Sequence, residues 1–219
     1  MKSRRTLLSA SLLSLVAAST SGAQTVTFYE SRDVFLGALA GAAVQTQDFS
    51  GIPAGTILTG VAVVPGLVAQ SSFPRLEVFL SGGDRAMFGI GRELSGGSYY
   101  EFVNVGGYTA LGFDIQSWDP RTSGASLLLT FASGATITRP LTATNATEGD
   151  PVFVGMITSV PFATLRLFEP AEVGGGINEE VAIDDLVAAT TVPEPSTVAL
   201  VASGLVVMGL RARRRRADA

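Results

Sequence analysis

The chain has 219 residues, of which 47% are hydrophobic and 16% are charged, and it contains no Cys and no His. Without these residue types it cannot form a Ser-His-Asp triad, a Cys-His nucleophile, an imidazole or thiolate zinc site, or a disulfide. The net charge is −4, but residues 24–192 hold seven Arg against 17 Asp and Glu, a net of −10. So acidic a segment, free of Lys, excludes nucleic acid as a partner, because a phosphate backbone needs clustered cations.

Residues 1–23 have the three-part layout of a secretory signal peptide. Lys2, Arg4 and Arg5 form the charged start, residues 7–18 are apolar, and small side chains follow up to a cleavage point before Gln24. The adjacent arginines also fit a twin-arginine signal, which would mean export in the folded state. Either signal predicts an exported protein.

Residues 24–189 are predicted to form one all-β domain, an antiparallel β-sandwich of jelly-roll type with one short N-terminal helix. The helix is expected to begin after Ser31 as N-cap, because Asp33 lies in its first turn and Phe35 and Leu39 follow helical spacing. Segments rich in β-branched and aromatic residues then alternate with Gly, Pro, Ser and Asp turns. The strands predicted in chain order are 25–29, 43–49, 60–64, 76–80, 86–90, 98–105, 110–116, 126–131, 135–141, 151–158, 163–168 and 181–188.

The only tryptophan, Trp118, lies between Asp114 and Asp119 and close to Arg121. A Trp beside Asp and Arg at the end of a strand can stack on a pyranose ring, so Trp118 and Asp119 are candidate sugar ligands. The alternative is that Trp118 fills the rim of the sandwich while Asp119 turns the chain. A secreted hydrolase that uses two carboxyls about 5–9 Å apart is a further hypothesis.

The last predicted strand contains Asp184 and Asp185. Regular alternation would place Asp185 on the face of Ile183 and Val187, where a carboxylate needs a partner. Structural calcium held by Asp184 or Asp185 together with Asp48 would satisfy it, since calcium prefers oxygen ligands. The alternative is a frayed edge strand with both side chains in solvent.

Three motifs of this domain occur in the order seen in many exported proteins that carry a C-terminal sorting signal. The same motifs also resemble those of calcium-containing carbohydrate-binding jelly rolls. Asp48-Phe49 stands where such modules often carry Phe-Glu. The resemblance implies a structural calcium shared by Asp48 and the Asp184-Asp185 pair. The motifs are Gln47-Asp48-Phe49-Ser50-Gly51, Leu111-Gly112-Phe113-Asp114-Ile115 and Ala182-Ile183-Asp184-Asp185-Leu186.

Residues 190–219 combine a short linker, an apolar stretch at 196–210 and a basic tail. The stretch would span about 22 Å as a helix, and snorkelling arginines and local thinning can close part of the gap to a bilayer core of about 30 Å. The positive-inside rule keeps the tail cytoplasmic and places the preceding domain outside. The tail arginines are Arg211, Arg213, Arg214, Arg215 and Arg216.

Val192-Pro193-Glu194-Pro195, the apolar stretch and the Arg cluster together resemble the PEP-CTERM sorting signal of exported Gram-negative proteins. The resemblance implies recognition and cleavage by an exosortase near the Pro-Glu-Pro motif. It also implies a protein tethered to the inner membrane on the periplasmic side, and then passed to the cell surface or the extracellular matrix. We therefore expect a non-catalytic structural or adhesive role linked to exopolysaccharide, with a carbohydrate-binding module and a carboxylate-based hydrolase as alternatives.

Overall fold

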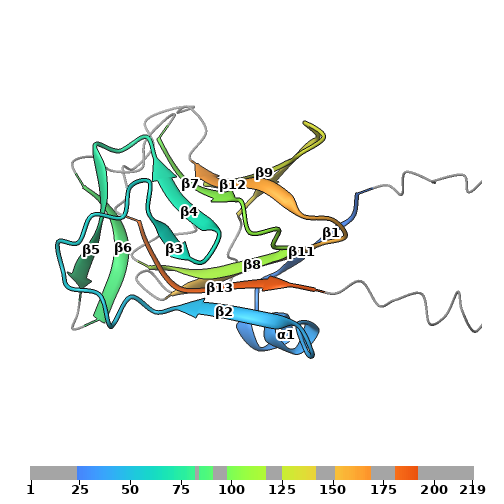
Figure 1. Cartoon of the computed structure of the whole chain (residues 1–219), viewed down its shortest axis with the longest axis horizontal. Coiled ribbons are helices and arrows are strands. Elements are labelled where there is room, and N and C mark those ends of the chain that lie inside the picture. The colour runs from blue at the N-terminus through green and yellow to red at the C-terminus, as the bar shows by residue number, and fades with distance from the viewer. Residues whose placement is uncertain are drawn as a thin grey trace, which may run out of the picture.

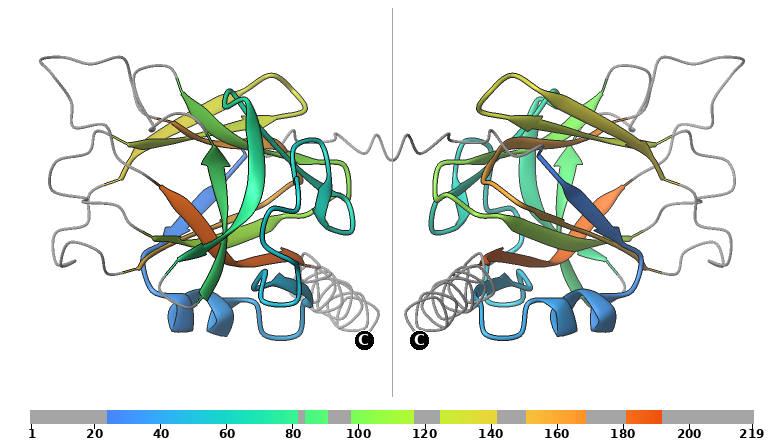
Figure 2. Two further views of the ribbon diagram at one scale, coloured as in Figure 1. Left: turned by 90° about the vertical axis from the view of Figure 1, so that its left-hand side faces the viewer. Right: turned by 90° about the vertical axis from the view of Figure 1, so that its right-hand side faces the viewer.

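The computed structural model describes residues 24–81, 84–90, 98–116, 125–141, 151–168 and 181–191. These residues form two antiparallel sheets packed face to face, with one helix outside them (Figures 1 and 2). The predicted β-sandwich with one short helix is therefore confirmed. Residues 1–23 and 196–210 lie outside the described residues, and no helix within the described residues is long and apolar enough to cross a membrane.

The first sheet, called sheet A, contains seven strands. They are β1 (Val26–Tyr29), β2 (Ala43–Gln47), β5 (Arg75–Ser81), β6 (Asp84–Ile90), β8 (Ala110–Gln116), β11 (Val152–Thr158) and β13 (Ala182–Thr190). The spatial order is β1-β11-β8-β13-β6-β5. Strand β13 is central: β8 pairs with one of its edges, while β6 pairs with its beginning and β2 with its end.

The second sheet, called sheet B, contains six strands. They are β3 (Ala62–Val64), β4 (Leu67–Ser71), β7 (Tyr99–Asn104), β9 (Ser126–Phe131), β10 (Thr136–Pro140) and β12 (Phe162–Phe168). The spatial order is β10-β9-β12-β7-β4-β3.

Each of the twelve predicted strands has a counterpart, whereas β4 was not predicted. It follows β3 after only Pro65 and Gly66, and Gly66 adopts a φ of +82° that suits glycine. The sequence around Pro65-Gly66 indicates a turn, but the short segment after it has only one β-branched residue. Strand β4 exists because its backbone pairs with β7, a long-range contact that local patterns do not show.

Alternate side chains of both sheets fill the space between them and form the main core. On β9 and β12, for example, Leu127, Leu129, Leu165 and Leu167 are buried. A buried hydroxyl also joins the sheets: Tyr100 of sheet B donates to the carbonyl of Val181 and accepts from the Gly89 N–H at 3.1 Å. This pairing satisfies a polar group that would otherwise be costly to bury.

The helix α1 (Arg32–Ala38) packs on the outer face of sheet A (Figure 2). As predicted, Ser31 is the N-cap, and its hydroxyl accepts from the Val34 N–H at 3.5 Å. Phe35 of the helix is fully buried and lies 5.4 Å, centroid to centroid, from Phe153 of β11. Gly112 leaves room for both rings, since a Cβ there would lie 2.7 Å from Phe153 Cζ and 2.9 Å from Phe35 Cε1. The helix therefore requires a strand without a side chain beneath it.

We predict that Gly112→Ala lowers the free energy of unfolding by about 1–3 kcal/mol, because the added methyl group overpacks the two rings. Urea titration measures the change. Gly37→Ala is the matched control: a Cβ at Gly37 meets nothing within 4 Å, and alanine favours the helix. Equal stability of Gly112→Ala and the native protein would contradict this packing.

Candidate functional site

A β-bulge in β13 shapes the acidic part of sheet A. Asp184 pairs with Asp114 of β8 and Val187 pairs with Gly112, so two residues of β13 oppose one residue of β8. Asp185, within the bulge, has a φ of +48°. The side-chain alternation breaks there, and the expectation that Asp185 shares an apolar face with Ile183 is wrong. Instead Asp184 is buried, with 2% exposure, and Asp185 is exposed.

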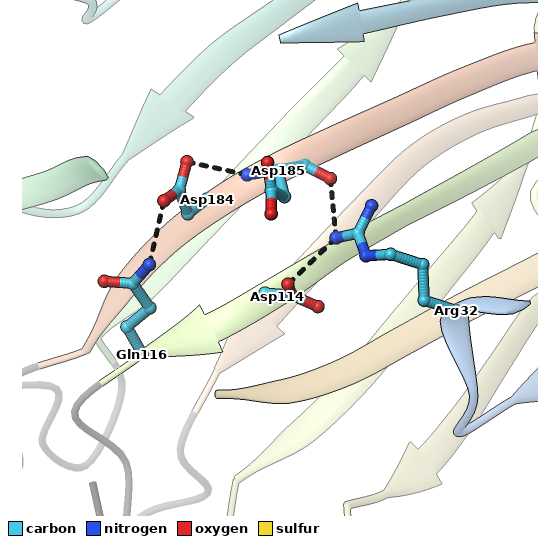
Figure 3. Close-up of polar contacts among 5 residues, drawn as sticks. All are labelled: Arg32, Asp114, Gln116, Asp184 and Asp185. Carbon is cyan, nitrogen blue, oxygen red and sulfur yellow. Dashed lines mark hydrogen bonds and ion pairs between the residues drawn. The ribbon is translucent and has the colours of Figure 1, made fainter. Parts of the chain in front are cut away.

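Asp184 is held by donors of the protein itself (Figure 3). Its Oδ2 accepts from Gln116 Nε2 at 2.8 Å, and its Oδ1 accepts from the backbone N–H of Asp185 at 2.7 Å. Both carboxylate oxygens thus receive hydrogen bonds, which offset the cost of removing the group from water. The second of these bonds also supports the left-handed backbone at Asp185.

Arg32, at the start of α1, completes this arrangement. Its Nη2 donates to the carbonyl of Asp185 at 2.8 Å and lies 3.0 Å from Oδ2 of Asp114 (Figure 3). Its guanidinium also lies 4.9 Å from the ring centroid of Phe153. We name Arg32, Asp114, Gln116, Asp184 and Asp185 the Arg32 cluster. It ties the helix to β8 and to the bulge of β13.

Burial raises the pKa of the Asp114 carboxyl above its usual value, and the charge of Asp185 raises it further. The charge and hydrogen bond of Arg32 act in the opposite direction but do not cancel the burial. Asp114 is therefore a carboxylate whose ionised form depends on the arginine beside it.

The residues predicted to share calcium do not form a coordination shell. Asp48 follows β2, and its Oδ1 accepts from the Ser50 N–H at 3.1 Å. Asp184 faces nitrogen donors, and the described residues contain no group of three or more Asp, Glu, His or Cys that could hold a metal ion. Calcium binding by Asp48, Asp184 and Asp185 stays a prediction, and an ion would have to displace the donors around Asp184.

The other predicted sites lie outside the described residues. This applies to the sugar candidates Trp118 and Asp119. It also applies to the sorting motif Val192, Pro193, Glu194 and Pro195 and to the tail Arg211, Arg213, Arg214, Arg215 and Arg216. The role of Arg32 was not predicted, because only the folded chain brings residue 32 beside residues 114 and 185. No local motif signals that contact.

The chain is an all-β sandwich followed by a C-terminal signal, and one comparison identifies that signal. Residues 191–216 match the PEP-CTERM protein-sorting motif. The chain therefore carries this motif, as predicted, and the motif indicates a secreted protein sorted via the cell envelope. No curated protein matches the chain.

Among solved structures, the chain is similar to family 29 carbohydrate binding modules. CBM29_1 from Piromyces equi shares 8% identity with a TM-score of 0.40, over 73% of this chain and 97% of that module. A CBM29-2 variant made to probe ligand recognition shares 13% identity with a TM-score of 0.39, over 68% of this chain and 91% of the module. At these values the likeness has no bearing on function.

We predict that Arg32→Gln raises the pKa of Asp114 further, because the two influences that lower it are lost while burial remains. A raised carboxyl pKa contributes stability that is present below the unfolded pKa and lost as pH rises through the folded pKa. In the native protein, the free energy of unfolding stops falling once the pH exceeds the folded-state pKa of Asp114. In the variant this pKa is higher, so the free energy of unfolding should continue to fall up to a higher pH. NMR titration of the Asp114 carboxyl carbon and urea unfolding between about pH 4 and pH 7 measure both effects.

Arg75→Gln serves as the control, because Arg75 pairs with Glu77 and not with Asp114. It should leave the Asp114 titration unchanged. An unchanged or lowered pKa in Arg32→Gln would show that Arg32 does not support the ionised carboxylate.

Proposed function

We propose that an exosortase cleaves the exported chain near Pro193-Glu194-Pro195 and that the released sandwich acts at the cell surface or in the extracellular matrix. Its role there is non-catalytic, structural or adhesive, and linked to exopolysaccharide. The observation that carries this proposal is the match to the sorting motif at 191–216, which begins where β13 ends.

The contacts of the last strand end before the proposed cleavage site, so cleavage there would leave the fold intact. The last pair between β13 and β2 is Thr190 with Ala43, and the Thr191 N–H donates to Oγ1 of Thr109 at 2.8 Å. Thr109 in turn donates its backbone N–H to Ala189 at 3.0 Å. Within the described residues every strand precedes Val192, so a cut near Pro193 leaves all of these pairings in place.

The sequence beyond the sandwich supports a membrane tether before cleavage. The apolar stretch 196–210 and the Arg-rich tail would hold the C-terminus in the inner membrane, with the sandwich in the periplasm. This single pass, the periplasmic orientation and the exosortase as partner are all parts of the proposal.

The Arg32 cluster supports a structural role for its carboxylates. Asp184 accepts two hydrogen bonds, and Asp114 pairs with Arg32. A glycoside hydrolase needs one carboxyl free to protonate the leaving group and a second to act as nucleophile or base. Carboxylates engaged by protein donors favour the non-catalytic proposal over the hydrolase alternative.

We predict that intact mass analysis of the protein from the medium and envelope of its source organism gives a chain that starts near Gln24 and ends near Pro193-Glu194-Pro195. Glu194→Ala should retain the Arg-rich tail and stay in the membrane fraction, because it removes the acidic residue of the sorting motif. Glu169→Ala is the matched control, since Glu169-Pro170 is a second Glu-Pro pair outside the motif. A native protein that keeps its tail, or equal processing of Glu194→Ala, would refute cleavage at this motif.

A further inference from the structure

The outer face of sheet B carries a row of paired residues that crosses five strands. Their order is Thr138 on β10, Leu128 on β9, Arg166 on β12, Glu101 on β7 and Gln70 on β4, and each is the register partner of the next. We call these five residues the polar row. At about 4.8 Å per strand it extends for about 19 Å, perpendicular to the strands.

The polar row points away from the core. The residues on either side of it along the strands are buried, among them Leu127 and Leu129 on β9 and Leu165 and Leu167 on β12. In contrast, Thr138 and Gln70 are exposed, and the side chains of Arg166 and Glu101 are 34% and 13% exposed. The row therefore places polar groups on the outer face of sheet B, where Thr130 and Thr164 of the neighbouring row are also partly exposed.

Hydrogen-bonding groups in the polar row are left without partners. Arg166 donates from Nε at 3.2 Å and Nη2 at 2.8 Å to a single oxygen, Oε1 of Glu101. In the described part of the chain, Arg166 Nη1, Glu101 Oε2 and the Gln70 amide have no hydrogen-bond partner. The row thus offers donors and acceptors side by side, with the positive charge matched by a negative one.

An aromatic residue lies next to the row. Tyr99 of β7 faces outward, and the Arg166 guanidinium lies 3.9 Å from its ring centroid. This cation–π contact and the hydrogen bonds to Glu101 together hold the guanidinium at the outer face of sheet B. Phe168 of β12, the register partner of Tyr99, adds a second partly exposed ring.

Figures 1 and 2 place α1 beside sheet A, on the far side of the sandwich from sheet B. The contacts of α1 are with β11 and β1, both in sheet A. The helix therefore leaves the polar row uncovered.

We propose that the polar row and Tyr99 form a binding site for a neutral polysaccharide chain. A glycan offers both hydroxyl groups for the free donors and acceptors and apolar C–H faces for the tyrosine and leucine. The inference deepens the proposed function, on which it rests, because it names the surface that would contact exopolysaccharide.

Charge decides between neutral and anionic glycans. Residues 24–192 carry a net charge of −10, and the one arginine of the row is already paired with Glu101. An acidic polysaccharide or a phosphate-rich surface would be repelled at long range and would find no unpaired cation in the row. A second copy of the chain is disfavoured, since the core of a protein interface is depleted in charged residues.

The test measures binding of the protein purified from its source organism to two neutral probes and one anionic probe. The neutral probes are hydroxyethylcellulose and the neutral fraction of the organism's own exopolysaccharide, and the anionic probe is alginate. We expect saturable binding to at least one neutral probe, independent of salt, and weaker binding to alginate. Arg166→Gln should weaken the binding about tenfold, because hydrogen bonds from a charged group are lost.

Gln70→Ala keeps the test valid if Arg166→Gln fails to fold, because Gln70 is exposed and contributes only its amide; we expect binding about threefold weaker. Arg75→Gln is the matched control: its ion pair with Glu77 is similar in length, and Glu77 is as buried as Glu101, but the pair lies on sheet A. Thermal unfolding establishes that each variant is folded.

Two results would overturn the proposal. One is no binding to either neutral probe, and the other is binding that both row variants leave unchanged. Two further results would also overturn it by assigning the surface to another ligand: stronger binding to alginate, and self-association that the row variants abolish. None of these results affects the sorting of the protein, which the mass analysis tests separately.

Discussion

The position of β13 is the constraint on which the rest of the structure depends. It is the last of the described strands, yet it lies in the middle of sheet A and pairs with β8, β6 and β2. Its residues Ile183, Leu186 and Ala188 are fully buried in the main core. Sheet A therefore cannot close until the C-terminal strand has joined it. The sorting motif begins directly after that strand, so the signal and the strand that completes sheet A are adjacent in the sequence.

The fold places three features at different positions: the exit of the C-terminal signal, the attachment of α1 and the outer face of sheet B. The C-terminal signal leaves the domain from sheet A, and the Arg32 cluster secures α1 on the outer face of the same sheet. Within the described part of the chain, α1 does not cover sheet B, whose outer face lies on the opposite side of the sandwich (Figure 1). Under the proposed function, a domain tethered through sheet A or released near residue 193 would present the polar row to material around the cell in either state.

Much of the fold could be predicted from the sequence, because turn residues and β-branched segments define strands locally. Ser31 and Asp33 likewise predicted the helix start. The failures came from long-range contacts. Strand β4 is specified by its pairing with β7, and the bulge at Asp185 depends on β8 and Arg32. The polar row requires the register of five strands, which no spacing within one segment reveals. The sorting motif was predictable because its residues are contiguous.

The central claim is that the sandwich is complete at Thr191, where the sorting motif begins. The most direct test compares the free energy of unfolding of a chain covering residues 24–192 with that of residues 24–219, with residues 24–181 as a third chain. The account predicts that the first two agree within about 0.5 kcal/mol. The third should fail to fold, because it lacks β13. A loss of several kcal/mol on ending the chain at residue 192 would contradict the account, since the motif would then be part of the folded domain.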